Sequence, residues 1–449
     1  MKQIRFFTTH LPVLLLVLLL VPNQFIYGKT ISLDEENPVV LSFDDAITQA
    51  MDHNAMLQQA NLDARIAGAQ RNQANAAFLP QVEAAYTALY TNNPLNAFGF
   101  KLNQRIVTQE DFNPALLNDP EFSRDYSAQL QLRQPLLNVD AILARRAASQ
   151  AADSKKYVAQ RTSEAVRFQV AQAYLQIALA YQNVEVMSQA EATAASFEQR
   201  AQAMSDEGII QKADLLEAKA YHLNITSKLQ MAESGIANSS DQLSLLMGAE
   251  IGVIYKVSDL RWTTPNTSVL DVMQRSDLLA YRSGLSAAKS MVQSSKMKWL
   301  PRINAFGSYQ FNDTEAFKFK EDSYMVGVSL SMTLFDGNQN IQKLRIARYE
   351  RDKVASKLLH EERAARADYE KAERQLRDLE VELDHANTMV EQTDEAWRIQ
   401  KNRYNEGLAP TNDLLRVQSQ LAERQLMKSM TDFKRNLTIA YLRFLVSQN

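Results

Sequence analysis

The sequence predicts a fold that is mainly α with a β-barrel part, in which long antiparallel coiled-coil helices are joined to four membrane strands per chain. The first observation behind this prediction is an alternation of apolar with small or polar residues over about ten positions, in residues 324–334 and again in 126–132. Alternation of that length is typical of a tilted strand that crosses a bilayer with one oily face. The second observation is a set of very long stretches that contain almost no Gly or Pro, which favour uninterrupted helices. A soluble sheet with one buried face would also alternate, so one strand alone does not decide between the two.

Composition narrows the classes of protein to which the chain can belong. The 449 residues include 12 Gly, 11 Pro and no Cys, and the net charge is −3. A balanced charge gives no electrostatic footprint for nucleic acid, so no nucleic-acid partner is expected. The lack of Cys excludes disulfides, thiolate zinc sites and thiol catalysis. So few Gly and Pro over this length argue against an ordinary loop-rich enzyme domain.

The N-terminus is expected to be a signal peptide over residues 1–28. Lys2 and Arg5 form a positive region, and the apolar run Leu11–Val21 is too short to span a membrane as a helix. Later in the sequence, no apolar run approaches the roughly 20 residues of a membrane helix. If the exported protein contacts a membrane, it must therefore do so through strands.

The first half of the chain opens with helices and a hairpin. A short helix is expected over Leu41–His53 with Ser42 as N-cap, and a longer helix from Ala55 is expected to end where Pro80 follows Leu79. Alternating residues then predict two strands, over 81–91 and 125–135. Residues 91–125 carry three prolines and several Asn and Asp, which indicates a long polar loop.

A long helix pair over residues 139–247 follows this hairpin. Apolar residues recur in its first helix at steps of four and three, which is the a/d seam of a coiled coil. These residues are Val166, Val170, Ala173, Ile177, Ala180, Val184 and Met187. At 1.5 Å per residue, about 65 residues make a rod of about 100 Å. Gly208 is expected to end this rod in the left-handed conformation, and a connector occupies residues 248–266 after the second rod.

The second half repeats this order. A short helix is expected over Val269–Asp277 and a longer one over Leu278–Trp299, which ends at Pro301 as the first ended at Pro80. Strands are expected over 302–312 and 323–334, and a long helix pair over 338–447. The a/d seam of this pair is regular. It comprises Tyr369, Ala372, Leu376, Leu379, Leu383, Ala386, Val390, Thr393 and Trp397.

The two halves correspond closely where each helix pair turns. The segment DEGIIQKADLL (Asp206–Leu216) aligns with NEGLAPTNDLL (Asn405–Leu415), with the Gly and the Asp at the same places. The sequence therefore predicts an internal structural repeat, with residues 29–266 as the first copy and 267–449 as the second. The main difference in length between the copies lies in the loop of the first hairpin.

Four strands are too few to close a barrel in a membrane. An open strand edge in lipid leaves backbone groups unpaired at several kcal/mol each, and closure takes about eight strands at least. Several chains must therefore pool their strands. Tyrosines near the strand ends fit the aromatic girdles of such barrels, or are ordinary hairpin aromatics. They are Tyr86, Tyr90, Tyr126, Tyr309 and Tyr324.

These features together resemble the TolC-type outer-membrane efflux channel family. The resemblance rests on the signal, the duplicated order of helix, hairpin and helix, the Leu-Pro pairs before the first and third strands, and the EGxxxxxDLL turn. It implies a homotrimer in the cell outer membrane that extends into the periplasm, with a barrel closed by trimerisation from twelve pooled strands. It further implies a helical tunnel and passive export of small molecules or polypeptides, which an inner-membrane pump and a periplasmic adaptor protein supply. The barrel would contact outer-membrane lipid.

The resemblance also implies a periplasmic gate at the two helix turns, marked by Gly208 and Gly407. Asp413 matches the position of an acidic ring at the entrance. One helical turn later Arg416 replaces a second acid, so that three Arg416 and three Asp413 could pair across chains and lock the closed state. Asp214 and Tyr404 match positions that latch neighbouring helices. Alternatively, Asp214 and Asp413 only stabilise helix N-termini, and Arg416 belongs to a solvated face.

Other classes of function have less support. The five His form no metal-ligand spacing, and the sequence contains no nucleophile elbow, phosphate-binding loop or dinucleotide fingerprint. We therefore expect no enzyme activity, no cofactor and no metal. The alternative to a channel is a non-channel exported coiled-coil structural or adaptor protein, which salt alone would extract from the membrane. A periplasmic adaptor would add Gly-rich β-domains, of which the sequence shows no sign.

Overall fold

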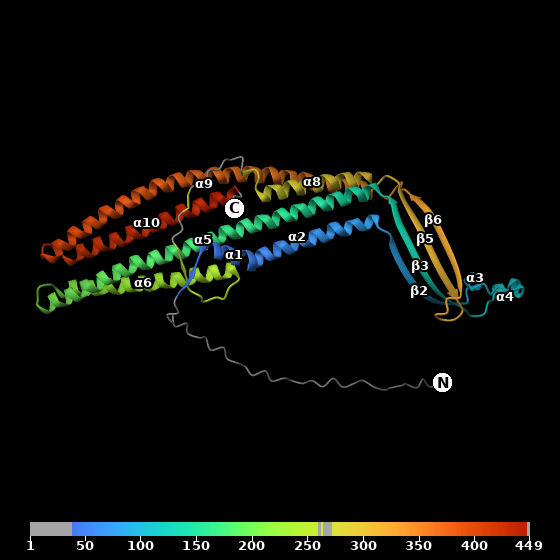
Figure 1. Cartoon of the computed structure of the whole chain (residues 1–449), viewed down its shortest axis with the longest axis horizontal. Helices are drawn as coiled ribbons and strands as arrows, with labels where there is room; N and C mark the ends of the chain where they lie inside the picture. Colours follow the sequence, from blue (N-terminus) through green and yellow to red (C-terminus); the bar gives the residue numbers. More distant parts are fainter. Residues whose placement is uncertain (1–37, 259–261, 264–271, 447–449) are drawn as a thin grey trace, which may run out of the picture. The chain divides into compact units, whose positions relative to one another are not determined.

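A computed structural model of the chain describes residues 38–258, 262–263 and 272–446 (Figure 1). The predicted signal peptide and the first three residues of the short helix expected over Val269–Asp277 lie outside these residues. The expected end of that helix was wrong, because residues 273–275 are not helical and Ser276 already begins the next helix. The helices are α1 (Phe43–His53), α2 (Ala55–Ala74), α3 (Pro94–Asn103), α4 (Pro114–Asn118), α5 (Val139–Asp206), α6 (Lys212–Met247), α8 (Ser276–Met297), α9 (Gln339–Asn405) and α10 (Thr411–Leu445), with short 3-10 turns η1 (Asn75–Phe78) and η2 (Gln109–Phe112). The strands are β1 (Val39–Leu41), β2 (Gln81–Thr91), β3 (Ser123–Leu137), β4 (Tyr255–Val257), β5 (Arg302–Asp313) and β6 (Glu321–Ser331).

The mainly helical fold class is confirmed, and its rods are continuous helices. Helices α5 and α9 have 68 and 67 residues and contain neither Gly nor Pro, so nothing in their sequence interrupts them. Most residues of the two predicted seams are buried, among them Val170 and Tyr369. Helix α5 packs against α6 and α8, α9 packs against α10 and α8, and α10 also lies against α5 (Figure 1).

The two hairpins form one antiparallel sheet in the order β2-β3-β5-β6. Its central pairing joins β3 of the first half to β5 of the second, with Gln129 opposite Gln310. Strands β2 and β6 are therefore the edges of this sheet and pair on one side only within the described part of the chain. The register brings the alternating residues of all four strands onto two distinct faces.

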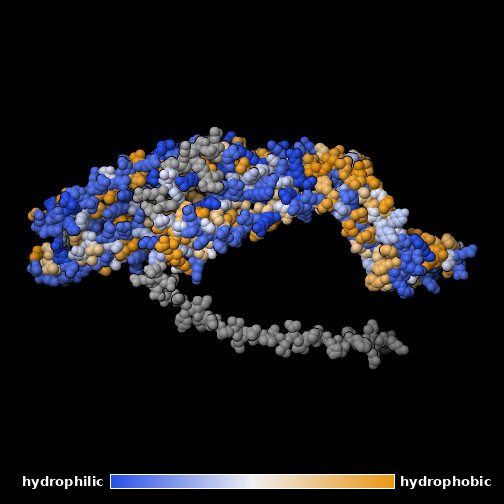
Figure 2. All heavy atoms as spheres, viewed as in Figure 1, coloured by the Kyte–Doolittle hydropathy of each residue, from blue (hydrophilic) through white to orange (hydrophobic). Residues whose placement is uncertain are grey.

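One face of the sheet is apolar and the other is polar. The apolar face carries exposed side chains, which are Val82, Tyr86, Tyr90, Leu130, Leu132, Tyr309, Tyr324, Val326, Val328 and Leu330. The opposite face carries Ser127, Gln129 and Gln131 of β3 and their partners Asn312, Gln310 and Ser308 of β5. Figure 2 shows hydrophobic residues gathered at the strand end of the chain, whereas the rods are mainly hydrophilic.

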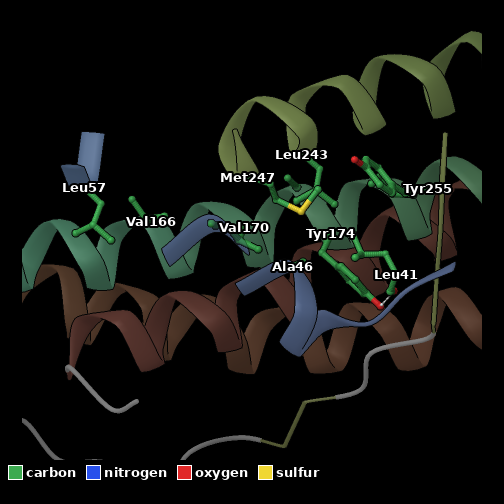
Figure 3. Close-up of a cluster of buried hydrophobic side chains, with 12 residues drawn as sticks. Leu41, Ala46, Leu57, Val166, Val170, Tyr174, Leu243, Met247 and Tyr255 are labelled. Carbon is green, nitrogen blue, oxygen red and sulfur yellow. Dashed lines mark hydrogen bonds between the residues drawn. The ribbon is translucent and has the colours of Figure 1, made fainter. Parts of the chain in front are cut away.

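A hydrophobic cluster around Tyr174 fixes α1 against the middle of the rods (Figure 3). Tyr174 of α5 is fully buried, and its hydroxyl donates to the Leu41 carbonyl oxygen at 3.0 Å. The same hydroxyl accepts from the Ser258 backbone N–H at 3.1 Å. Leu41 ends β1, which pairs in parallel with β4. Sequence periodicity did not predict either of these two strands, because three residues are too few to show a period.

Two further sequence expectations were wrong in detail. The strand expected over 323–334 is β6, which begins at Glu321 and ends at Ser331. Ser331 pairs with Arg302, and the residue before Arg302 is Pro301, which has no N–H to extend the ladder. Residues 91–125 are not a plain polar loop, because they contain α3, η2 and α4. The expected N-cap Ser42 is confirmed, and its side chain accepts from the Asp45 N–H.

The described residues from Val39 onward form one compact unit. The two halves therefore pack together rather than as separate domains, and the division near residue 266 stays an interpretation of the sequence. Within the described residues, no helix is both long and apolar enough to cross a membrane.

Candidate functional site

The turns between the long helices have the same backbone geometry at both tips. At the first tip, Gly208 N–H bonds to the Ser205 oxygen at 3.0 Å and Ile209 N–H to the Met204 oxygen at 2.8 Å. At the second tip, Gly407 and Leu408 make the same pair of bonds to α9 at 3.0 and 2.8 Å. This is the Schellman motif, which requires a left-handed residue. Gly208 (φ 72°) and Gly407 (φ 74°) supply it, so the predicted helix stops are confirmed.

Asp214 lies in the first turn of α6 and stabilises its own helix. A side-chain oxygen of Asp214 accepts from the Gln211 backbone N–H at 3.2 Å. This bond satisfies a backbone donor that the start of a helix leaves free, and a carboxylate there is also favoured by the helix dipole. The structure thus gives Asp214 the helix-capping role that the sequence left open. Its expected role as a latch stays a prediction.

Tyr404 lies near the end of α9 and packs inward. Its side chain is 5% exposed and lies edge-on to the Phe197 ring of α5, with the ring centroids 6.1 Å apart. Leu414 and Leu415 of α10 complete the same cluster. The Tyr404 hydroxyl finds no hydrogen-bond partner among the residues that the structure describes. Tyr404 therefore joins three helices by apolar contact while it leaves one polar atom unpaired.

Further polar atoms in this region are buried without a partner in the described part of the chain, among them Nε1 of Trp397 and Oε1 of Gln418. A buried polar atom without a hydrogen bond costs about 1 to 3 kcal/mol.

Asp413 and Arg416 form an ion pair within one helix. Arg416 Nη2 lies 3.8 Å from Asp413 Oδ1, three residues earlier in α10. Both side chains are exposed, so the pair contributes at most about 1 kcal/mol. The sequence left open a pairing of Asp413 with Arg416 across chains, and the structure shows that one chain can form the pair alone. The opposite charges of Asp413 and Arg416 therefore partly cancel within a single copy.

The structure adds a contact at the tips that the sequence did not indicate. Arg200 of α5 donates from Nη1 to the side-chain oxygen of Asn405, the last residue of α9. The contact ties the first rod of one half to the first rod of the other. Local sequence periodicity could not predict this contact, because Arg200 and Asn405 are about 200 residues apart.

His222 of α6 lies between two carboxylates of α5. Nδ1 is 2.6 Å from Glu198 Oε2, and Nε2 is 3.0 Å from Glu191 Oε1. Ionised carboxylates only accept hydrogen bonds, so this arrangement favours the imidazolium form, in which both ring nitrogens donate. Two hydrogen bonds raise the pKa of His222, and the bond to Glu191 contributes more than the bond to Glu198. Within the described residues, no group of three or more His, Asp or Glu could hold a metal ion.

Comparisons with known proteins agree on one family. A family model described as outer membrane efflux protein matches residues 46–249 and 272–445. Among curated proteins, the alkaline protease secretion protein AprF of Pseudomonas aeruginosa is 21% identical over 432 residues, which are 91% of this chain and 85% of AprF.

Solved structures show the same fold. The CmeC outer membrane channel of Campylobacter jejuni has a TM-score of 0.80 at 15% identity, over 90% of this chain and 85% of CmeC. The outer membrane protein VceC of Vibrio cholerae has a TM-score of 0.75 at 17% identity, over 90% of this chain and 95% of VceC.

Proposed function

Because this chain belongs to the outer membrane efflux protein family, we propose that three copies pool their strands into one barrel and form an exit channel with a periplasmic helical tunnel. Members of this family lie in the outer membrane and are channels rather than enzymes. The trimer, the gate residues, the partners and the cargo go beyond family membership and are argued in the following paragraphs.

The observation that carries the proposal is the pair of open edges on the four-stranded sheet. Strands β2 and β6 each lack a neighbour on one side within the described residues, while the sheet between them exposes an apolar face of bilayer-spanning length. Unpaired backbone groups in lipid cost several kcal/mol each. Pairing β6 of one copy with β2 of the next removes both edges. Three copies of a four-stranded sheet give twelve strands, which is enough to enclose an aqueous lumen.

The two faces of the sheet support this arrangement. In a closed barrel the face with Val326, Val328 and Leu330 would meet lipid. The face with Gln129, Gln131 and Gln310 would then line a water-filled lumen, where polar side chains remain hydrated. The reverse orientation would bury amides in hydrocarbon without partners.

The rods would continue the lumen into the periplasm as the tunnel wall. The tips at Gly208 and Gly407 would then form its entrance, with Asp413 near the opening and Tyr404 and Asp214 at the contacts between helices. The unpaired polar atoms of Trp397, Tyr404 and Gln418 support a closed tip that can rearrange. We propose Asp413 and Arg416 as the charged pair that shapes ion preference at this entrance.

We propose that a periplasmic adaptor protein and an inner-membrane pump deliver the cargo to these tips. AprF is named for the secretion of an alkaline protease. By analogy, polypeptides are one cargo class for this channel, and small molecules are the other. A deletion strain tested against a panel of toxic compounds, together with analysis of its secreted proteins, separates the two.

Two measurements on the purified protein test the channel itself. The detergent-solubilised protein should have the mass of three copies, and it should pass current across a planar bilayer. A monomer that carries no current would overturn the proposal. Release from the outer membrane by salt alone would favour a peripheral coiled-coil protein instead.

A further inference from the structure

The first hairpin differs from the second in the segment that joins its strands at the end away from the rods. Only residues 314–320 join β5 to β6, whereas residues 92–122 join β2 to β3 and include α3, η2 and α4. We call residues 92–122 the outer segment. Figure 1 shows α3 and α4 beyond the strand ends, on the side opposite the rods.

The outer segment has a defined fold of its own. Lys101 Nζ and Asp111 Oδ1 are 2.6 Å apart, and the other Asp111 oxygen accepts from the Thr108 N–H at 2.7 Å. The hydrogen bond from Lys101, with that from Thr108, lowers the pKa of Asp111 to about 2. The Phe98 and Phe112 rings meet edge to face at 5.6 Å. These contacts close the segment between α3 and η2 into a compact unit.

Gln104, which follows α3, attaches this unit to the sheet. Its side chain is 3% exposed, and Nε2 donates to Asp125 Oδ1 and to the Arg124 carbonyl oxygen, both at 2.8 Å. The second Asp125 oxygen accepts from Asn312 Nδ2 at 2.9 Å. This network links α3 to β3 and β5. Because the network is buried, its hydrogen bonds are shielded from competition by water.

The parity of Asp125 and Asn312 shows which side of the sheet the outer segment covers. Asp125 points to the same face as Ser127 and Gln129, and Asn312 is the partner of Ser127 on that face. This is the polar face, yet Asp125 and Asn312 are only 3% and 2% exposed. The outer segment therefore lies over the polar side at the outer end of the strands.

Arg105 extends this attachment to the edge strand β6. Arg105 Nη2 donates to the Asp322 carbonyl oxygen at 2.7 Å, and Nη1 lies 3.4 Å from Glu321 Oε2. Its backbone has φ 53°, a left-handed conformation that costs a non-Gly residue about 1 kcal/mol or more. The contacts with β6 offset that cost. Gln104 and Arg105 together hold the outer segment against β3, β5 and β6.

We propose that the outer segment narrows the outer mouth of the channel, and that Gln104 and Arg105 are the positioning residues that hold it there. The inference rests on the proposed function, because the polar face lines a lumen only in a closed barrel. In that barrel each copy contributes one outer segment to the mouth. The mouth then limits the size of a solute that passes, independently of the periplasmic tips.

The test compares Gln104→Met with Asn103→Ala in planar bilayers. Met has a similar length to Gln but donates no hydrogen bond, and Asn103 is an exposed neighbour that serves as the control. We expect Gln104→Met to raise the conductance of the open-tip state about twofold, because the outer mouth limits conduction once the tip is open. It should also admit larger poly(ethylene glycol) molecules from the outer side but not from the tip side. A loss of stability alone would not produce this one-sided change.

A second measurement does not depend on how Gln104→Met folds. The chain has no Cys, so Ser127→Cys places a single thiol on the polar face. We expect a small maleimide added from outside to label it and a bulky polymer maleimide to fail. Replacing residues 94–120 by a short Gly-Ser turn in the same background should allow both reagents to react.

The outcomes distinguish this inference from the proposed function. If the wild type assembles and conducts, but the shortened variant has the same conductance, polymer cut-off and labelling, the outer segment does not narrow the mouth. If the wild type neither assembles nor conducts, the proposed function fails, and this inference fails with it.

Discussion

Arg200 of α5 donates a hydrogen bond to the side chain of Asn405 at the end of α9. The two residues come from different halves of the chain, and their contact ties the two tips together. A hydrogen bond of this kind contributes about 1 kcal/mol at an exposed site, which corresponds to about a fivefold change in a two-state equilibrium.

Arg200→Ala should therefore favour an open tip. We expect the fraction of time spent in the high-conductance state to rise about fivefold in bilayer recordings, if the contact is made only in the closed state. Arg398→Ala is the matched control, because Arg398 pairs with Glu395 in its own helix. Equal open fractions for wild type and Arg200→Ala would show that the contact does not hold the tip.

Asp413 offers a test of charge at the entrance. Asp413→Asn removes the carboxylate and leaves Arg416 without its helical partner. We expect the cation-to-anion permeability ratio to fall about twofold or more, because rings of like charge set ion preference in pores. The measurement is the reversal potential under a salt gradient. Asp384→Asn, on the exposed side of α9, is the control and should leave the potential unchanged.

His222 predicts a dependence of tip stability on pH. Because Glu191 and Glu198 raise its folded pKa, its contribution is fully present below the unfolded value of about 6.5 and is lost as pH rises through the raised value. The thermal midpoint of wild type should thus exceed that of His222→Gln at about pH 5.5, and the gap should shrink towards about pH 9. His360→Gln, exposed on α9, is the control. A gap that is constant with pH would contradict the imidazolium bridge.

Tyr174 tests the core that fixes β1 and β4 to the rods. Tyr174→Phe leaves the Leu41 oxygen and the Ser258 N–H without the hydroxyl that serves both, at a cost of about 1 to 3 kcal/mol. Tyr174→Ala adds a cavity and should cost about 3 to 5 kcal/mol. Thermal unfolding of the assembled protein should rank wild type above Tyr174→Phe and Tyr174→Phe above Tyr174→Ala. The control is Tyr349→Phe, since Tyr349 is 71% exposed.

The succession of long helices and strands along the chain was predictable from the sequence, because local residue patterns determine it. Rods that contain no Gly or Pro must end near Gly208 and Gly407, and the structure ends α5 and α9 within two residues of these positions. Alternation located the four strands of the sheet. The end of β6 was misplaced, because its length depends on Pro301 in the neighbouring strand rather than on its own residues.

Features that depend on contacts between distant residues could not be predicted. The pairs Asn93-Pro94 and Asn113-Pro114 indicate a loop when the sequence is considered alone. In the structure, however, the first pair starts α3 and the second starts α4. Asn at the N-cap and Pro at N1 favour a helix start as much as a turn, so the dipeptide alone is ambiguous. At the end of α3, Gln104 donates to Asp125 of β3, and this contact between residues distant in sequence is not visible in local patterns.

The open edges of β2 and β6 have a consequence for biogenesis. In water, a newly synthesised copy exposes two unpaired strand edges next to the apolar face of the sheet. This combination promotes aggregation. The rods are hydrophilic and need no such protection. We therefore expect an isolated copy to aggregate through these strands unless they are shielded until neighbouring copies pair with them.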